Sequence, residues 1–151
     1  MGTVSAAAGG QRTGAVTASP VEVLLRAHHA VSSRLDDLLE PHGLSVAKLG
    51  VLRQLAKGPL PLGALAQRQS CVRSNITQLI DRMEAEGLVR RLPDRDDRRV
   101  TLAEITAAGQ ARLAAGVAAQ AEAERALLSD LSGAEAETLA GLLARVATPA
   151  L

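Results

Sequence analysis

Residues 70–106 read SCVRSNITQLIDRMEAEGLVRRLPDRDDRRVTLAEIT, and the pattern of this segment determines the predicted fold. Its first half repeats apolar residues at three- and four-residue spacing, which predicts a helix over about 72–86. The inward stripe is Ile76, Leu79, Ile80 and Met83. Gly87 follows as the C-terminal cap, where a left-handed residue is common. The second half predicts two short strands, 88–92 and 100–105, joined by a charged hairpin tip.

The flanking sequence predicts further helices on both sides. Ser70 is the expected N-cap of the central helix, and Ser45 caps a helix that Gly58-Pro59 ends. A short helix carrying Leu62, Leu65 and Ala66 lies between them. Ser19-Pro20-Val21-Glu22 is a capping box that opens a long N-terminal helix. Thr106 caps an Ala-rich helix to about residue 129, and Ser132-Gly133-Ala134-Glu135 opens the last one.

Two short helices, a tight connection, a helix and a β-hairpin predict a winged helix-turn-helix. The expected fold class is therefore mainly α with a small β-hairpin. We expect a disordered tail over 1–18 and one domain over 19–151, with the winged core at about 45–105. The helices at about 20–40 and 107–147 carry apolar stripes that a winged domain cannot cover alone, so we expect them to form a dimer.

Composition excludes several function classes. The 151 residues include no Phe, Tyr or Trp, so no aromatic platform can stack single-stranded bases. The single Cys excludes an internal disulfide and a multi-Cys zinc site. We find no nucleophile–base set, no phosphate-binding Gly loop and no metal-ligand cluster, so we expect no enzyme, cofactor or metal. Without a spanning apolar run or a signal peptide, we expect a cytoplasmic protein with no membrane partner.

Charge is concentrated in the middle of the chain. The net charge is only +1, but residues 68–99 hold eight Arg against six acids, and every base there is Arg. Arg is suited to bidentate contact with guanine or phosphate. The outer face of the central helix and the hairpin tip are thus the expected contacts to double-stranded DNA, and Ser70 is expected to help the helix N-terminus hold a phosphate. The candidate DNA-binding residues are Ser70, Arg73, Ser74, Asn75, Thr77, Gln78, Arg82, Arg95, Arg98 and Arg99.

A second interpretation of the hairpin remains open. The Arg residues of the tip could pair locally with Asp94, Asp96 and Asp97. Both interpretations can hold together, because Asp97 could orient Arg99 while Arg95 or Arg98 stays free. A winged module that binds a protein partner instead of DNA is a further alternative.

The segment from Leu65-Ala66 through Ser74-Asn75-Ile76-Thr77-Gln78 to Arg90-Arg91 resembles the MarR family of bacterial transcriptional regulators. So do Asp97-Arg98-Arg99 in the hairpin and Ile105-Thr106-Ala107-Ala108-Gly109 after it, with Ile105 where the family usually has Leu. The matching motifs span about 62–109. The flanking helices agree in order and length.

The resemblance implies a homodimer in which the N-terminal helix and the last two helices intertwine. It implies a repressor that reads a pseudo-palindromic operator, one half-site per subunit. It also implies a crevice between the dimer helices and the winged domain for a small anionic or aromatic effector. Its possible polar partners here are Arg26, His28, His29, Arg34 and His42.

Cys71 and the histidines each carry an alternative. Cys71 beside Arg68 and Arg73 at a helix N-terminus could be a reactive thiol, which would make the protein a redox-responsive regulator. The other interpretation is a small residue that packs the turn. His28 and His29 point about 100° apart on a helix, so a shared metal is less expected than a packing, solvated or pocket role.

Overall fold

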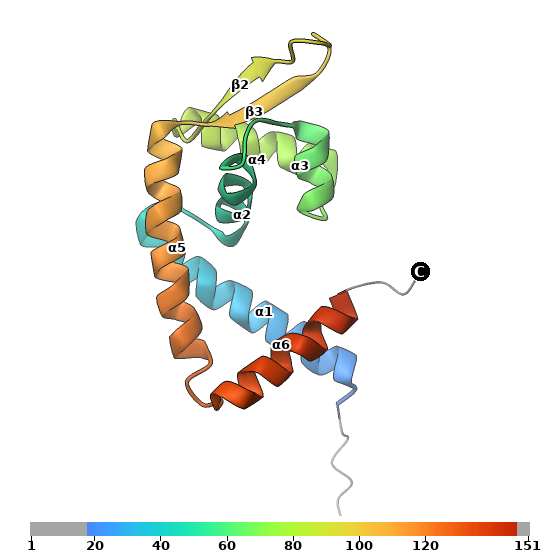
Figure 1. The fold of residues 1–151 in the computed structure, drawn as a ribbon, viewed down its shortest axis with the longest axis vertical. Coiled ribbons are helices and arrows are strands. Elements are labelled where there is room, and N and C mark those ends of the chain that lie inside the picture. The colour runs from blue at the N-terminus through green and yellow to red at the C-terminus, as the bar shows by residue number, and fades with distance from the viewer. Residues whose placement is uncertain (1–17, 148–151) are drawn as a thin grey trace, which may run out of the picture.

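The computed structural model describes residues 18–147, so the tail predicted for 1–18 lies almost wholly outside the described residues. The helices and strands follow the predicted order (Figure 1). They are α1 (Pro20–Leu39), the 3-10 turn η1 (Glu40–His42), α2 (Val46–Leu55), β1 (Leu60–Pro61), α3 (Leu62–Arg68), α4 (Arg73–Ala85), β2 (Val89–Pro93), β3 (Thr101–Ile105), α5 (Ala107–Leu127) and α6 (Gly133–Ala147).

Local capping chemistry sets most helix starts. Ser19 accepts from the Val21 N–H while Glu22 accepts from the Ser19 N–H, which completes the predicted capping box of α1. Ser132 and Glu135 make the same exchange at the start of α6. The side chains of Ser45 and Thr106 also cap α2 and α5 as predicted.

The connection between α3 and α4 differs from the prediction. Ser70 does not cap α4; its φ is +49°, and the N-cap is Val72, which has no capping side chain. The Ser70 N–H instead donates to Gln67 O and the Cys71 N–H to Ala66 O. This Schellman pair ends α3 and satisfies its last carbonyls. Ser70 therefore terminates one helix and does not begin the next.

The sheet has three antiparallel strands in the order β1-β3-β2. The hairpin of β2 and β3 is confirmed, with Val89 opposite Ile105 and Pro93 opposite Thr101. β1 was not predicted, because two residues that include Pro61 are too short to show an alternating pattern.

The hydrophobic core lies mainly inside the winged unit. Leu52 and Leu55 of α2, Leu65 of α3, and Ile76 and Ile80 of α4 are almost fully buried. Within residues 18–147, every charged or polar residue is at least partly exposed. Burial of an aliphatic side chain stabilises the fold by roughly 1.5–3 kcal/mol. This aliphatic cluster therefore holds the inner face of α4 in place and leaves the opposite face exposed.

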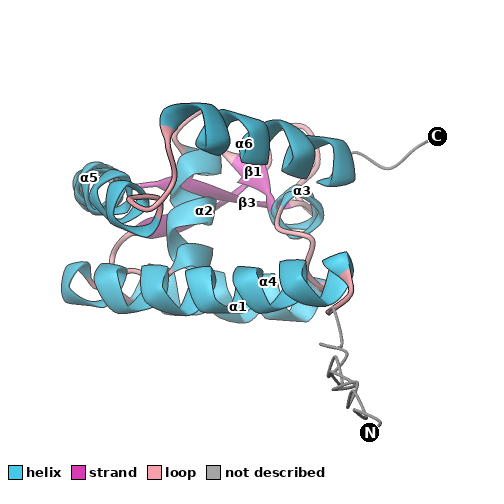
Figure 2. Ribbon diagram, turned by 90° about the horizontal axis from the view of Figure 1, so that it is seen from below, coloured by secondary structure: helices cyan, strands magenta, loops and turns pink. Residues whose placement is uncertain are grey.

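The long helices form an arm below this core. In Figure 1, α5 runs down from the sheet and turns into α6, while α1 packs on α5. Figure 2 shows α1 and α6 lying apart from each other. Leu39 is the only buried residue of α1, and α6 has none. None of the helices within residues 18–147 combines the length and apolar character needed to cross a bilayer.

Candidate DNA interface

Helix α4 presents a polar face to solvent. Its stripe of Ile76, Ile80 and Met83 is buried, with Leu79 packed at the edge of the core. The opposite face exposes Arg73, Ser74, Asn75, Gln78 and Arg82. These are five of the six helix residues predicted to contact DNA, and their donors and acceptors are of the kinds that can read base edges in a major groove.

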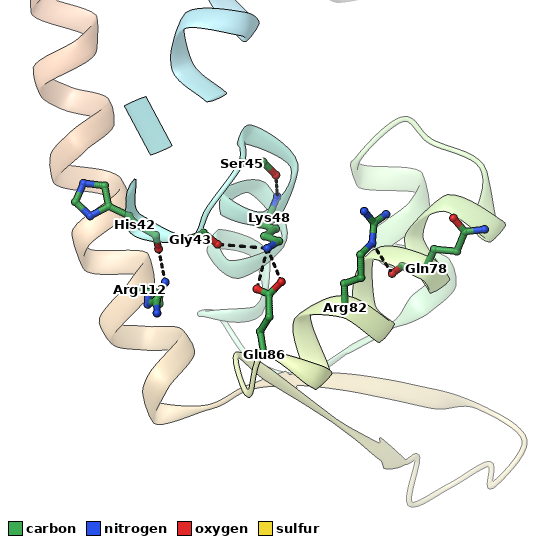
Figure 3. Close-up of polar contacts among 8 residues, drawn as sticks. All are labelled: His42, Gly43, Ser45, Lys48, Gln78, Arg82, Glu86 and Arg112. Carbon is green, nitrogen blue, oxygen red and sulfur yellow. Dashed lines mark hydrogen bonds and ion pairs between the residues drawn. The ribbon is translucent and has the colours of Figure 1, made fainter. Parts of the chain in front are cut away.

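The sixth residue, Thr77, is less available. It is half-buried, and its hydroxyl donates to Arg73 O at 2.9 Å within the helix. The Arg82 Nε–H likewise donates to Gln78 O at 3.2 Å (Figure 3), and the Arg82 side chain is exposed. Arg73 lies over the start of α3, since a Cβ at Gly63 would be 2.9 Å from an Arg73 terminal nitrogen.

The hairpin tip is organised by its aspartates. Asp94 Oδ1 accepts from the backbone N–H groups of Asp96 and Asp97, at 2.7 and 3.1 Å. These two hydrogen bonds lower the pKa of Asp94. Asp97 accepts from the backbone N–H of Arg99 and not from its guanidinium. The acids therefore shape the backbone.

The cations of the tip stay exposed. Arg95, Arg98 and Arg99 are exposed, and none of the ion pairs found within residues 18–147 includes them. Of the two interpretations of the hairpin, the structure therefore favours cations that are free to meet phosphate.

Two further arginines lie at the base of the wing and are already paired. Arg90 on β2 pairs with Glu104 on β3, its partner in the strand register. Arg91 turns toward α4 and pairs with Asp81 at 2.6 Å and Glu84 at 2.7 Å. Burial lowers the pKa of Arg91, but hydrogen bonds to these carboxylates outweigh it and the pKa is raised. Sequence reasoning assigned neither residue a role, because these partners are set by the tertiary arrangement.

Comparison with known proteins places this arrangement in a family. Residues 42–100 match the model of the MarR family. The HTH-type transcriptional regulator MhqR of Bacillus subtilis is 31% identical over 125 residues, which cover 82% of this chain and 86% of that protein. The chain belongs to the MarR family. The homoprotocatechuate degradative operon repressor of Escherichia coli is 34% identical over 89 residues, covering 58% of this chain and 60% of that protein.

Solved structures agree with the fold. A probable transcriptional regulator from Pseudomonas aeruginosa aligns with a TM-score of 0.78 and 32% identity, over 85% of this chain and 96% of its own. A mutant MarR from E. coli complexed with operator DNA aligns with a TM-score of 0.77 and 23% identity, over 83% and 91%. This MarR-family chain is thus a DNA-binding transcriptional regulator with a winged helix, and its relatives are regulators, not enzymes.

Lys48 of α2 joins the C-terminal end of α4 to the turn between η1 and α2. The Lys48 ammonium donates to both carboxylate oxygens of Glu86, at 2.7 and 2.8 Å, and to Gly43 O at 3.3 Å (Figure 3). Arg112 of α5 donates to His42 O on the other side of the same turn. Lys48, Glu86 and Arg112 line an open pocket of about 490 Å³ there.

The residues predicted for an effector crevice do not come together in one chain. Arg26, His28 and His29 are exposed on α1. Arg34 alone of the five lines a pocket of about 330 Å³ between α1 and α5, with Asp37 and Leu38. His42 is half-buried beside Arg112. Nowhere in 18–147 do three or more His, Cys, Asp or Glu side chains gather as metal ligands would.

Cys71 lies one residue before the N-cap of α4, not one residue after it as predicted. It is half-buried and packs against the core cluster. Its backbone N–H is used in the turn that ends α3. These contacts favour the interpretation in which Cys71 packs the turn.

Proposed function

We propose that this protein is a homodimeric repressor that reads a pseudo-palindromic operator with α4 and the wing. The observation that carries the proposal is the pairing of two surfaces: the exposed polar face of α4 and the unpaired Arg residues of the hairpin tip. In a winged helix the first suits base edges in the major groove, and the second suits phosphates beside it. A repressor role is supported by the relative that carries that name. Binding chromosomal DNA would place the protein in the cytoplasm.

A two-fold partner is supported by the arm helices. Exposed aliphatic side chains line α1 and α6, and Val21, Leu142 and Val146 are 63%, 52% and 68% exposed. Exposed apolar surface of this kind marks a protein interface. A second copy is the expected occupant, because an isologous contact uses the same surface on both subunits and sets two α4 helices at a fixed spacing.

Effector control is the finer part of the proposal. A solved relative is described as regulated in its DNA binding by 6-hydroxynicotinic acid, a planar anion. This chain has no Phe, Tyr or Trp to stack on such a ring. An anionic ligand would therefore rely on cations such as Arg34 and on aliphatic walls, completed by the partner subunit.

The test separates the two DNA contacts. Arg95→Ala and Arg99→Ala remove proposed phosphate contacts, so the slope of log K against log salt should fall by about one for each. Asn75→Ala and Gln78→Ala remove proposed base contacts, so preference should relax at particular base pairs, by about 1–3 kcal/mol for a good bidentate contact. Fluorescence anisotropy gives the salt slope on the intergenic duplex beside the protein's own gene, and it gives the base preference on copies of that duplex with single base-pair changes. Unchanged binding in all four variants would contradict the assignment.

A further inference from the structure

The strongest unassigned arrangement is the set of contacts that Arg91 makes with α4. We propose that Arg91 is a positioning residue that fixes the angle between the DNA-reading helix and the wing, and through it the specificity of DNA binding. The inference rests on the proposed function, since it concerns the same two surfaces. Arg91 itself is not a DNA contact in this account.

Arg91 contacts Thr77, Asp81 and Glu84 of α4, and we call this set of contacts the clamp. The Arg91 backbone N–H donates to Glu84 Oε1 at 2.9 Å, and its guanidinium donates to Glu84 Oε2 at 2.7 Å. The same guanidinium reaches Asp81 Oδ1 at 2.6 Å and Thr77 O at 3.4 Å. Residues 77, 81 and 84 share one face of a helix across two turns. One side chain on β2 therefore holds α4 at three successive points.

The chemistry of the group suits that task. A guanidinium is planar, presents five donors and stays charged, so it can satisfy several acceptors in one fixed orientation. The Arg91 side chain is only 25% exposed. The side chains of Asp81 and Glu84 are 57% and 38% exposed, so salt screens these ion pairs in part. The several contacts of one guanidinium, and not burial of the acids, therefore fix the position of α4.

The same contacts offset part of the negative charge on the reading helix. The single positive charge of Arg91 balances one of the two negative charges of Asp81 and Glu84, and without it both would repel the DNA phosphates. Arg90 is the matched control that separates loss of a positive charge on β2 from loss of the contacts with α4. It pairs with Glu104 across the sheet, and none of the hydrogen bonds or ion pairs found within residues 18–147 joins its side chain to α4. Its loss removes the same charge from the adjacent residue of β2 while leaving the clamp in place.

The experiment compares Arg91→Met with Arg90→Met. Each protein is titrated by fluorescence anisotropy against the intergenic duplex beside its own gene and against a scrambled duplex of equal length, at several salt concentrations. Arg91→Met should lower the ratio of the two affinities by about tenfold or more, because several charge-assisted hydrogen bonds are lost together. Arg90→Met should keep the ratio within about threefold of wild type. Equal ratios in the two variants would overturn the inference.

A triple variant separates positioning from charge. In D81N/E84Q/R91M the carboxylates of residues 81 and 84 are removed together with the guanidinium that held them. Because the contacts between β2 and α4 are lost, the ratio of the affinities for the intergenic and scrambled duplexes should stay low. Full recovery of the wild-type ratio would mean that Arg91 only balances charge, which contradicts the proposal. If Arg91→Met does not fold, Arg91→Lys decides in the same assay. The single ammonium of lysine cannot reproduce the planar set of donors of a guanidinium. A lowered ratio of the two affinities is therefore expected, and an unchanged ratio overturns the proposal.

Failure of the proposed function is distinguishable in these data. A wild-type protein that binds both duplexes equally contradicts the operator-reading function and this inference together. A wild-type protein that discriminates, beside an Arg91→Met variant that discriminates equally well, contradicts the inference alone. Urea midpoints for each variant correct the titrations for the folded fraction.

Discussion

At the scale of single residues, Gly109 shows why the motif from Ile105 to Gly109 has its spacing. The Thr106 hydroxyl lies 2.6 Å from Gly87 O and caps α5 through the Gly109 N–H. This brings α5 against the end of α4, and a Cβ at Gly109 would overlap the Leu88 carbonyl oxygen and lie 2.8 Å from Ile105 Cγ1. A carbonyl in the backbone cannot rotate away as a side chain can.

Gly109→Ala should therefore destabilise the fold, by roughly 1–3 kcal/mol as for other overpacked sites. The measurement is urea unfolding followed by circular dichroism. Gly133→Ala is the matched control, because a Cβ at the start of α6 meets nothing within 4 Å. The control should be as stable as wild type or slightly more so. Equal stability of the two variants would show that the close approach at Gly109 is not a constraint.

At the scale of elements, local signals and tertiary signals behave differently. The caps at Ser19, Ser45 and Thr106 were predictable because each side chain bonds to its own helix start. The error at Ser70 has a local cause of another kind. α3 ends there with a left-handed residue, and a serine does not signal that conformation as a glycine would. The exposed face of α4 was predictable from helical period, whereas the partners of Arg91 were not, because they come from a different element.

Protonation of Asp94 at the hairpin tip should weaken the turn of the wing. Hydrogen bonds from the Asp96 and Asp97 amides lower the pKa of Asp94. A lowered folded-state pKa means that this stabilisation of the turn is present above the unfolded-state pKa and is lost as pH falls through the folded-state value. An NMR titration of the two amides should give a midpoint below 3.8, the ordinary value. A midpoint at or above that value would contradict the turn geometry.

At the scale of the whole molecule, the division into a winged core and dimerisation helices stays a prediction. It rests on apolar stripes that continue beyond the residues that a winged core can cover. What the sequence could not supply is the pocket arrangement. The five polar residues expected around a crevice are dispersed within one chain, and only Arg34 lines a pocket. A site between subunits is fixed by how two copies pack, which a single sequence does not encode as a local pattern.

Leu142→Lys tests the arm as the dimer interface. Leu142 is 52% exposed on a helix with no buried residue, so a charge there should be tolerated by the isolated fold and should oppose association. Sedimentation velocity should show a dimer for wild type and a shift toward monomer for the variant. Val46→Lys, at an apolar position of α2 that is 37% exposed, should remain dimeric. A Leu142→Lys protein that stays dimeric would place the interface elsewhere.

The most direct test of operator reading by a homodimer is a DNase footprint on the intergenic DNA beside the protein's own gene. Two α4 helices related by a two-fold axis should protect one pseudo-palindromic site, with half-site centres about 10 base pairs apart or a multiple of that spacing. Protection should appear at protein concentrations far below those that cover scrambled DNA. Uniform coverage of the fragment, or protection of a single unpaired half-site, would contradict the account.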